Sequence, residues 1–554
     1  MRSENETLQS IIVVPAKRPI VSRIVECSKG LIAIALLFPC SFTLAGASTD
    51  KCSELSKLTL PDAAIGMAKT AAPGSFAPPN HPDAPSESQV FETMPAFCRV
   101  TVVLRPSVDS NIKVEVWMPA SGWNGRLQAQ GNGGFAGSID YFAMALAIHA
   151  GYATAGTDTG HTGGDTDAQW ALGHPEKVVD YGYRAIHEMT VKAKKIVTAY
   201  YGSAPRDSYF CSCSNGGREA LMEAQRFPTD YNGIIAGASM NNFSHNLAAF
   251  AWDALALTRT SASIVPPAKL AAIASSVLAA CDGQEGVKDH LLNDPASCHY
   301  DPAVLRCGET ESDACLTQPQ ITSLTKIYAG AKTSSGRQIY PGFEPGGELG
   351  SGGWDHWMLG KPGGRQLEYA NSYYQNLVMS NPNWDYRTMD FERDTKLADD
   401  KTAVILNATD PNLEAFRNAG GKLILYHGWS DAAIAPQNTI DYYNSVVARM
   451  GSAAEGFLRL YMVPGLQHCV GGTGAVTFGQ LDDETPDPGQ SIYAALESWV
   501  ERGKAPGNIT ATRYENDSDR GSPILFTRPL CAYPNRATYR GAGDVNDARN
   551  FSCQ

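Results

Sequence analysis

One serine lies where a strand-like segment meets a helix-like one, in the run YFCSCSNGGREALMEAQRFP (209–228). The first three residues have strand character, and residues 218–226 have the apolar spacing of an amphipathic helix. A serine hydroxyl is a weak nucleophile unless a base takes its proton and a third group orients that base. A tight strand-to-helix turn would present Ser214 above a sheet, with Gly216 as the small neighbour that such a turn needs. Because Ser212 stands where glycine is usual, the run alone also fits an ordinary turn.

An acid and a base follow in the order that this kind of turn requires. Enzymes with a strand-to-helix nucleophile place Asp or Glu and then His on later loops, each after a strand of the sheet. Asp431 ends the strand-like run LILYHGWSD, and His468 ends LYMVPGLQH. His427 lies closer to Asp431 but inside the end of a strand, which favours a structural role for it. The sequence therefore predicts a Ser214–His468–Asp431 triad.

Cysteines flank two of these three residues directly. Cys213 precedes Ser214, and Cys469 follows His468. A disulfide between them would tie the base to the nucleophile loop and fix a distance that otherwise depends on long-range packing. Two unrelated buried thiols are the alternative. We favour the disulfide because the cysteines adjoin the serine and histidine that the mechanism selects independently.

The other cysteines suit an oxidising compartment. Of the 13 cysteines, Cys27 and Cys40 lie in or before an apolar leader, so eleven remain and one thiol is left over. Five disulfides are plausible in an exported chain. Besides Cys213 with Cys469, the spacing suggests four pairs: Cys281 with Cys298, Cys307 with Cys315, Cys531 with Cys553, and Cys52 with Cys98 around the start of the mature chain. Cys211 is the cysteine left over.

The leader and the net charge limit the partners. Basic residues precede GLIAIALLFPCSFTLAGA (30–47), whose last residues match an A-x-A cleavage pattern. The apolar part is short and interrupted for a spanning helix, so we expect a signal peptide over 1–47 and export to the periplasm or medium. A membrane anchor is the alternative. The net charge of -12 argues against binding a phosphate backbone, so nucleic acid is not an expected partner.

The rest of the chain alternates between strand and helix patterns. Residues 48–98 have few periodic runs and are expected to be an irregular lead-in, and alternation begins at Arg99. Strands that alternate with helices predict an α/β fold, a mostly parallel sheet covered on both faces. The alternation of strand and helix patterns is interrupted over residues 240–411 and resumes at residue 412. We therefore expect one core, formed by 48–239 and 412–554, that carries a large lid at 240–411.

At this point the chain resembles the tannase and feruloyl esterase family, whose members have an α/β-hydrolase fold. The resemblance covers nearly the whole mature chain and is marked by three runs: CSNGGREALMEAQRFPTDYNGIIAGA, LILYHGWSDAAIAP and VPGLQHCVGG. It implies Ser214 as nucleophile, Asp431 as acid and His468 as base. It also implies the Cys213–Cys469 disulfide between them.

Acyl transfer also needs donors for the oxyanion of the tetrahedral intermediate. The backbone N–H of Asn215, directly after the nucleophile, is one expected donor. The other should come from the early glycine loop QGNGGFAG (130–137), where we favour Gly134 over Gly133. A phosphate-binding role for this loop is disfavoured because no lysine follows at P-loop spacing. His161, in the loop TDTGHTGG, could line the pocket and is left unassigned.

An acidic loop in the lid predicts a cation site. In CDGQEGVKDHLLNDPASC (281–298), the carboxylates of Asp282, Glu285 and Asp289 alternate with glycines, which suits Ca²⁺; a solvated acidic turn is the alternative. The family resemblance implies a lid calcium at the matching places and adds the carbonyls of Val287 and Leu291. The chain departs from that pattern at Glu285, where Asp is common, and at His290, where Gly is common. We expect a structural ion and no organic cofactor.

These observations predict a secreted serine carboxylesterase that acts on small esters of aromatic acids. Feruloyl esters rank first, and galloyl esters and the mono(2-hydroxyethyl) ester of terephthalate are alternatives that the resemblance also allows. Lid tyrosines 369, 373 and 374 are candidates to hold the acyl ring, with core packing as an equal alternative, and Arg365 could pair with an acid group of the substrate. A secreted binding protein that has lost turnover is the alternative of another class.

Overall fold

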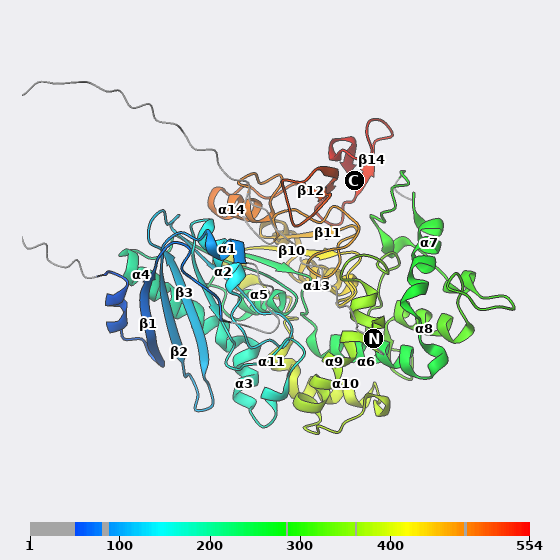
Figure 1. The fold of residues 1–554 in the computed structure, drawn as a ribbon, viewed down its shortest axis with the longest axis horizontal. Coiled ribbons are helices and arrows are strands. Elements are labelled where there is room, and N and C mark those ends of the chain that lie inside the picture. The colour runs from blue at the N-terminus through cyan, green and yellow to red at the C-terminus, as the bar shows by residue number, and fades with distance from the viewer. Residues whose placement is uncertain (1–49, 80–87, 284–285, 361–362, 481–484) are drawn as a thin grey trace, which may run out of the picture.

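A twisted sheet of nine strands forms the centre of the protein (Figure 1). The structure is a computed structural model and describes residues 50–79, 88–283, 286–360, 363–480 and 485–554. The order across the sheet is β1-β2-β3-β5-β4-β6-β7-β10-β11. Pairing is antiparallel from β1 through β5 and parallel from β5 to β11. The strands of this sheet are β1 (Ala63–Ala71), β2 (Phe97–Leu104), β3 (Ile112–Pro119), β4 (Arg126–Ala129), β5 (Ala153–Thr157), β6 (Asp207–Cys213), β7 (Gly233–Gly237), β10 (Lys422–Gly428) and β11 (Leu458–Val463).

The parallel strands are buried on both faces. In β10, Leu423 and Leu425 belong to one hydrophobic cluster, whereas Ile424 and Tyr426 belong to another. Successive side chains of a strand point to opposite faces, so the two clusters lie on the two sides of the sheet. Helices α4, α5 and α13 cover the first cluster and α14 covers the second. The core helices are α1 (Ser88–Glu92), α2 (Tyr141–His149), α3 (Pro175–Val179), α4 (Ala185–Tyr201), α5 (Asn215–Arg226), α12 (Glu414–Asn418), α13 (Pro436–Met450) and α14 (Ile492–Arg502).

A large, mainly helical insertion leaves the sheet after β7 and returns before β10. These two strands are neighbours in the sheet, so the chain departs and re-enters at almost the same place. In Figure 1 the insertion, in green to yellow-green, lies beside the end of the sheet away from β1. Its elements are α6 (Phe243–Thr258), α7 (Leu270–Cys281), α8 (Gln318–Ala329), β8 (Ala331–Lys332), β9 (Gln338–Tyr340), α9 (Gly364–Tyr373), α10 (Arg393–Ala398) and α11 (Val404–Leu406).

The region expected to be an irregular lead-in contains a strand of the central sheet. β1 pairs antiparallel with β2 along its whole length. Its sequence, AAIGMAKTA, consists mainly of small residues, and none of its nine residues is buried. An edge strand of this composition lacks the alternation of apolar and polar residues by which half-buried strands are recognised, and therefore the prediction was wrong here.

Five disulfides link segments of the described part of the chain, and each joins a pair expected from the sequence. They connect Cys52 with Cys98, Cys213 with Cys469, Cys281 with Cys298, Cys307 with Cys315, and Cys531 with Cys553. Buried Cys211 is the one described cysteine outside a disulfide. Two small sheets complete the C-terminal region: β12 (Ile509–Tyr514) with β13 (Ile524–Leu530), and β14 (Ala537–Tyr539) with β15 (Phe551–Cys553).

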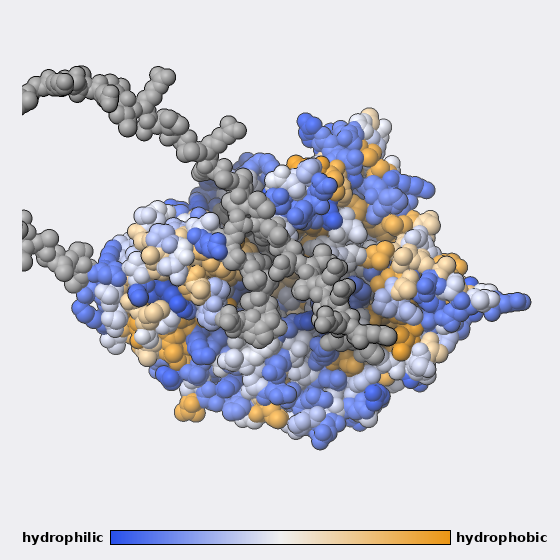
Figure 2. All heavy atoms as spheres, viewed as in Figure 1, coloured by the Kyte–Doolittle hydropathy of each residue, from blue (hydrophilic) through white to orange (hydrophobic). Residues whose placement is uncertain are grey.

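One helical stretch in the described residues, Ser261–Cys281, could cross a membrane by length and composition alone. α7 is its C-terminal part, and buried Ile273 and Val277 pack into the insertion. Core helices of soluble proteins pass the same test. In Figure 2 hydrophobic residues gather near α7 among hydrophilic ones, and hydrophilic residues cover much of the visible face. The predicted signal peptide lies outside the described residues.

Candidate active site

Ser214 occupies the sharp corner between β6 and α5. Its backbone has φ +65° and ψ -126°, a conformation that L-residues rarely adopt. Gly216 makes this corner possible, because a Cβ there would lie 1.9 Å from the hydroxyl of Ser212. The same contact explains why serine is tolerated at 212, where glycine is usual: the space for its hydroxyl comes from Gly216 and Gly131.

Three side chains form one chain of hydrogen bonds above this corner. The hydroxyl of Ser214 lies 2.8 Å from Nε2 of His468, and Nδ1 of His468 lies 2.8 Å from Oδ2 of Asp431. Asp431 follows β10, and His468 lies in the loop after β11, so both reach Ser214 from the carboxyl ends of parallel strands. This arrangement allows an imidazole to accept the serine proton while a carboxylate holds the ring in the right tautomer.

The buried Asp431 carboxylate is kept ionised by its neighbours. Burial alone would raise its pKa, but the charge of His468 and hydrogen bonds from His427 and His468 lower the pKa below its ordinary value. The backbone N–H groups of Ala433 and Ile434 also donate to Oδ1, at 2.8 and 2.9 Å. His427 is fully buried, between Asp431 and the hydroxyl of Thr439, and does not occupy the place of the base.

The disulfide between Cys213 and Cys469 links the residues next to Ser214 and His468. It joins positions 256 residues apart, and the two Cα atoms lie 6.0 Å from each other. Cys469 has φ +65°, so both Ser214 and Cys469 have backbone conformations that are rare for L-residues. Covalent closure here limits how far the base can move from the hydroxyl.

The glycine loop after β4 packs directly against the start of α5. The hydroxyl oxygen of Tyr181 lies 2.7 Å from the carbonyl oxygen of Gly134 and 2.9 Å from Oδ1 of Asn215, so its single proton is shared between these two acceptors. Gly134 has φ +52°, and a Cβ there would lie 2.4 Å from the hydroxyl of Tyr369. The two segments expected to supply oxyanion donors are therefore tied together by one tyrosine. The loop is also held by His161, whose Nε2 lies 2.8 Å from the carbonyl of Phe135; burial lowers the pKa of His161 to about 4.

A buried glutamate on α5, which sequence analysis missed, reinforces this contact. Oε2 of Glu219 accepts the backbone N–H of Asn132 at 2.9 Å, and Oε1 accepts from Nδ2 of Asn215 at 3.1 Å. Burial raises the pKa of Glu219 to about 7, even though the guanidinium of Arg218 lies 4.0 Å away. The sequence feature that could have identified Glu219 is its charge, since it lies on the apolar face of a predicted helix.

The insertion brings an aromatic ring to the triad. The indole of Trp357, in the π-helical turn Asp355–Leu359, meets the ring of His468 edge-on with centroids 5.2 Å apart. Tyr369 lies beside Trp357 and against the glycine loop, and its hydroxyl donates to Asp165 at 2.8 Å. Arg365 forms an ion pair with the same Asp165 carboxylate. Neither Trp357 nor Asp165 was singled out from the sequence, since their roles depend on contacts between distant segments.

The other predicted acyl-contact tyrosines lie in the core of the insertion. Tyr373 is fully buried and its hydroxyl lies 2.7 Å from that of Thr402. Tyr374 is also fully buried and stacks on Trp384. For this pair the structure favours the packing alternative over contact with a substrate.

The acidic loop of the insertion brings two carboxylates inward. Oδ1 and Oδ2 of Asp282 accept the backbone N–H groups of Asp289 and His290, each at 3.3 Å. Asp289 accepts from Arg528 at 2.5 Å through Oδ2. His290 has φ +63°, which explains why glycine would suit this position. Glu285 lies outside the described residues, whereas Val287 and Leu291 follow in the same loop.

Comparison with known proteins agrees with the observed fold. The nine-stranded sheet with helices on both faces is an α/β-hydrolase-like fold, and the crystal structure of feruloyl esterase B from Aspergillus oryzae matches it with a TM-score of 0.82. That match is 29% identical and covers 91% of this chain and 99% of the other. An uncharacterized esterase of Xanthomonas campestris pv. campestris is 40% identical over 92% of each chain. A probable feruloyl esterase B-2 of Neosartorya fischeri is 30% identical over 91% of this chain and 95% of its own.

A family model described as tannase and feruloyl esterase matches residues 98–554. The chain belongs to the tannase and feruloyl esterase family, a family of carboxylic ester hydrolases.

Proposed function

We propose that the protein is a serine carboxylesterase that hydrolyses esters of aromatic acids, of the feruloyl type first. The observation that carries this proposal is the hydrogen-bonded series from Ser214 through His468 to Asp431, with 2.8 Å at each step. The relatives named feruloyl esterase support the choice of acyl group. Galloyl esters and the mono(2-hydroxyethyl) ester of terephthalate are the alternatives to be compared directly.

The proposed mechanism follows from these contacts. As the Ser214 oxygen attacks the ester carbonyl, Nε2 of His468 takes the hydroxyl proton and Asp431 stabilises the imidazolium. The carbonyl oxygen becomes an oxyanion, which we propose is bound by the N–H groups of Asn215 and Gly134. The C–O bond to the alcohol then breaks, and His468 gives its proton to the leaving alkoxide. Water repeats the sequence on the acyl-enzyme, releases the acid and returns the proton to Ser214.

The aromatic acyl group is proposed to lie against Trp357. The indole of Trp357 is the aromatic ring of the insertion that contacts His468. Packing between this indole and the aromatic ring of the acyl group would add stability beyond that of the buried area. Tyr369 and Arg365 lie in the same region, but Tyr369 donates a hydrogen bond to Asp165 and Arg365 forms an ion pair with it. We therefore propose that Arg365 positions Tyr369 through Asp165, and that it binds an acid group of a substrate only if this ion pair opens.

Two measurements test the proposed function. The first compares kcat/KM for methyl ferulate, methyl gallate and mono(2-hydroxyethyl) terephthalate, with S214A as the inactive control. Methyl ferulate should have the highest value, and a different order would replace the feruloyl assignment without affecting the serine mechanism. The second is mass spectrometry after treatment with a fluorophosphonate. Absence of both an acyl burst and labelling at Ser214 would favour the binding protein that has lost turnover.

We also propose a structural Ca²⁺ in the loop 281–298. The donor set fits, because Asp282 and Asp289 provide two largely buried carboxylates and Gly283 and Gly286 adopt positive φ; Asp289 would share its carboxylate between the ion and Arg528, which already contacts Oδ2. Glu285 and the carbonyls of Val287 and Leu291 would complete the set. The ion would supply charge that offsets these carboxylates and would stabilise the loop, and the serine mechanism makes no use of it.

Export to an oxidising compartment is part of the proposal. Five disulfides in the described residues are typical of exported proteins and rare in the cytosol. The periplasm or the medium is the proposed location. Mass analysis of the N-terminus of the mature chain tests the predicted cleavage after Ala47.

A further inference from the structure

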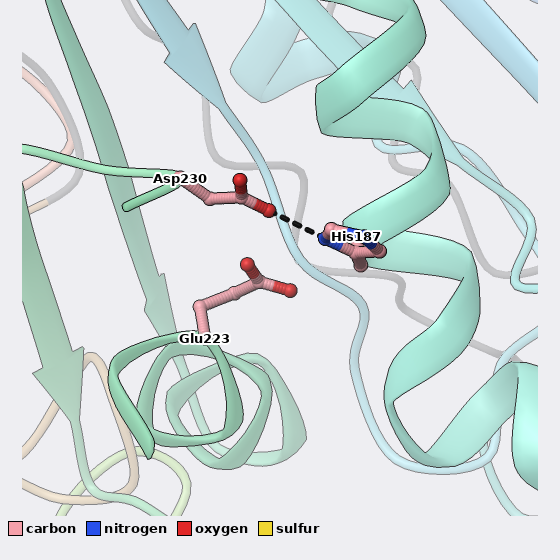
Figure 3. A group of neighbouring side chains, drawn as sticks. All are labelled: His187, Glu223 and Asp230. Carbon is pink, nitrogen blue, oxygen red and sulfur yellow. Dashed lines mark hydrogen bonds and ion pairs between the residues drawn. The ribbon is translucent and has the colours of Figure 1, made fainter. Parts of the chain in front are cut away.

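A histidine and two carboxylates converge on the side of the protein formed by α4, α5 and the loop after α5 (Figure 3). His187 belongs to α4, Glu223 to α5, and Asp230 to the loop that leads into β7. Nδ1 of His187 lies 2.6 Å from Oδ2 of Asp230, and the carboxylate of Glu223 points toward this pair. In the described part of the chain this is the one group of three such side chains whose ligand atoms lie within 4.8 Å of one another.

Glu223 is the unusual member of this group. Only 1% of its surface is exposed, and neither carboxylate oxygen has a donor within hydrogen-bonding reach; its near neighbour is a second carboxylate, Asp230, with which it can hydrogen-bond only by sharing a proton. A buried carboxylate without a partner is strongly destabilising, so such groups are normally paired, protonated or bound to a metal. Burial and the neighbouring charge of Asp230 raise the pKa of Glu223 well above its ordinary value.

The basic side chains near Glu223 are already engaged elsewhere. The ammonium of Lys194 donates to the backbone carbonyl of Asp230, although its charge is near enough to lower the pKa of Glu223 somewhat. The ring of His187 stacks on Phe227, with centroids 3.8 Å apart, and hydrogen-bonds Asp230. The side chain of His187 is 28% exposed, so the histidine end of the cluster is in contact with solvent.

The geometry points to a divalent-cation site formed by His187, Glu223 and Asp230, with Zn²⁺ as the ion that suits its donors. One imidazole and two carboxylates form a donor set of a kind that Zn²⁺ accepts, and water would take the open position. Tetrahedral ligands of Zn²⁺ lie about 3.3 Å apart for bonds of about 2.0–2.1 Å. Small movements of the three side chains are therefore sufficient, with the His187–Asp230 hydrogen bond replaced by two bonds to the ion. This site is separate from the lid calcium loop.

Calorimetric titration with ZnCl₂ tests the site, using untagged protein in buffer with millimolar Ca²⁺ so that the lid loop stays saturated. The wild type should bind one more Zn²⁺ per chain than E223Q or H187N does, or bind it at least tenfold more tightly, and its Tm should rise with Zn²⁺. H174Q is the matched control, because His174 also pairs with an aspartate, Asp109, at 3.0 Å, but its side chain is 47% exposed. H174Q should titrate as the wild type does.

The melting temperature of E223Q without any metal is a second test of the proposal. Glutamine cannot ionise, so E223Q never has to bury a charge at this position, and its Tm without Zn²⁺ should equal or exceed that of the wild type. Equal Zn²⁺ stoichiometry and affinity in the wild type and E223Q would overturn the proposal, as would the absence of saturable binding by the wild type. A lower Tm for E223Q without Zn²⁺ would also overturn it, because the carboxylate would then already have a stabilising partner.

Discussion

Replacing Glu219 by Gln tests whether a buried carboxyl group under the active site makes stability depend on pH. Glu219 is 1% exposed, and its pKa is raised from 4.5 to about 7 by burial. The folded protein therefore binds this proton more tightly than the unfolded chain does. The stability that results is fully present below pH 4.5 and is lost as the pH rises through about 7.

The size of the effect follows from the two pKa values. A rise from 4.5 to about 7 corresponds to roughly 3 kcal/mol of unfolding free energy. Because glutamine carries no charge at any pH, E219Q should gain about this much relative to the wild type between pH 4.5 and pH 8. Urea unfolding followed by tryptophan fluorescence, with the disulfides kept oxidised, measures the difference. Most other groups titrate alike in E219Q and the wild type, so their contributions cancel in the difference between the two unfolding free energies. A difference that stays constant with pH to within about 1 kcal/mol would refute the reasoning.

A second substitution at the same position separates charge from hydrogen bonding. Alanine removes both acceptors and leaves the buried N–H of Asn132 without its partner, which costs about 1–3 kcal/mol. The glycine loop should then lose its alignment with α5. If the whole cost of the lost hydrogen bond raises the activation free energy, kcat of E219A should fall about 5- to 150-fold. E219Q keeps one acceptor and should lie closer to the wild type. Equal kcat values for E219A and E219Q would mean that Glu219 does not hold the loop.

Three further predictions concern the triad and its supports. D431N should keep the fold but lower kcat by about 10⁴ on an aryl ester, because the asparagine amide favours the wrong tautomer of His468; an unchanged rate would exclude Asp431 from the mechanism. Replacing both Cys213 and Cys469 by serine should lower the unfolding free energy by up to about 5.5 kcal/mol in a chain-entropy estimate for a 256-residue loop, seen as a lower urea midpoint. Chelator treatment should lower Tm more than the initial rate at low temperature, and added Ca²⁺ should restore it; loss of rate with Tm unchanged would contradict a structural ion.

The three residues that are hydrogen-bonded in series at the candidate site could be proposed from the sequence because each is marked by a local pattern. Ser214, Asp431 and His468 each follow a recognisable strand, and the carboxyl ends of parallel strands meet at one edge of the sheet. Alternating strand and helix patterns likewise predicted the fold class that the structure and the relatives share. Adjacent cysteines added a long-range constraint that few sequences provide.

The supporting residues were not predictable in the same way. Tyr181, Glu219 and Trp357 act through contacts with segments far away in the chain, and no local pattern marks such contacts. Tyr373 shows a case in which local sequence left two alternatives equally open. Aromatic residues close together in the insertion suggested a substrate surface, but burial depends on how the helices pack, and Tyr373 lies in their core.

Two separate sets of contacts hold the groups around Ser214. On one side, the Cys213–Cys469 disulfide limits the distance between His468 and the hydroxyl. On the other side, Tyr181 and Glu219 hold the glycine loop against the first turn of α5. The two sets share no side chain. Loosening His468 therefore need not move the glycine loop, and loosening the glycine loop need not move His468. Both sets act on the backbone next to Ser214, whose strained conformation persists only because its surroundings fix it on each side.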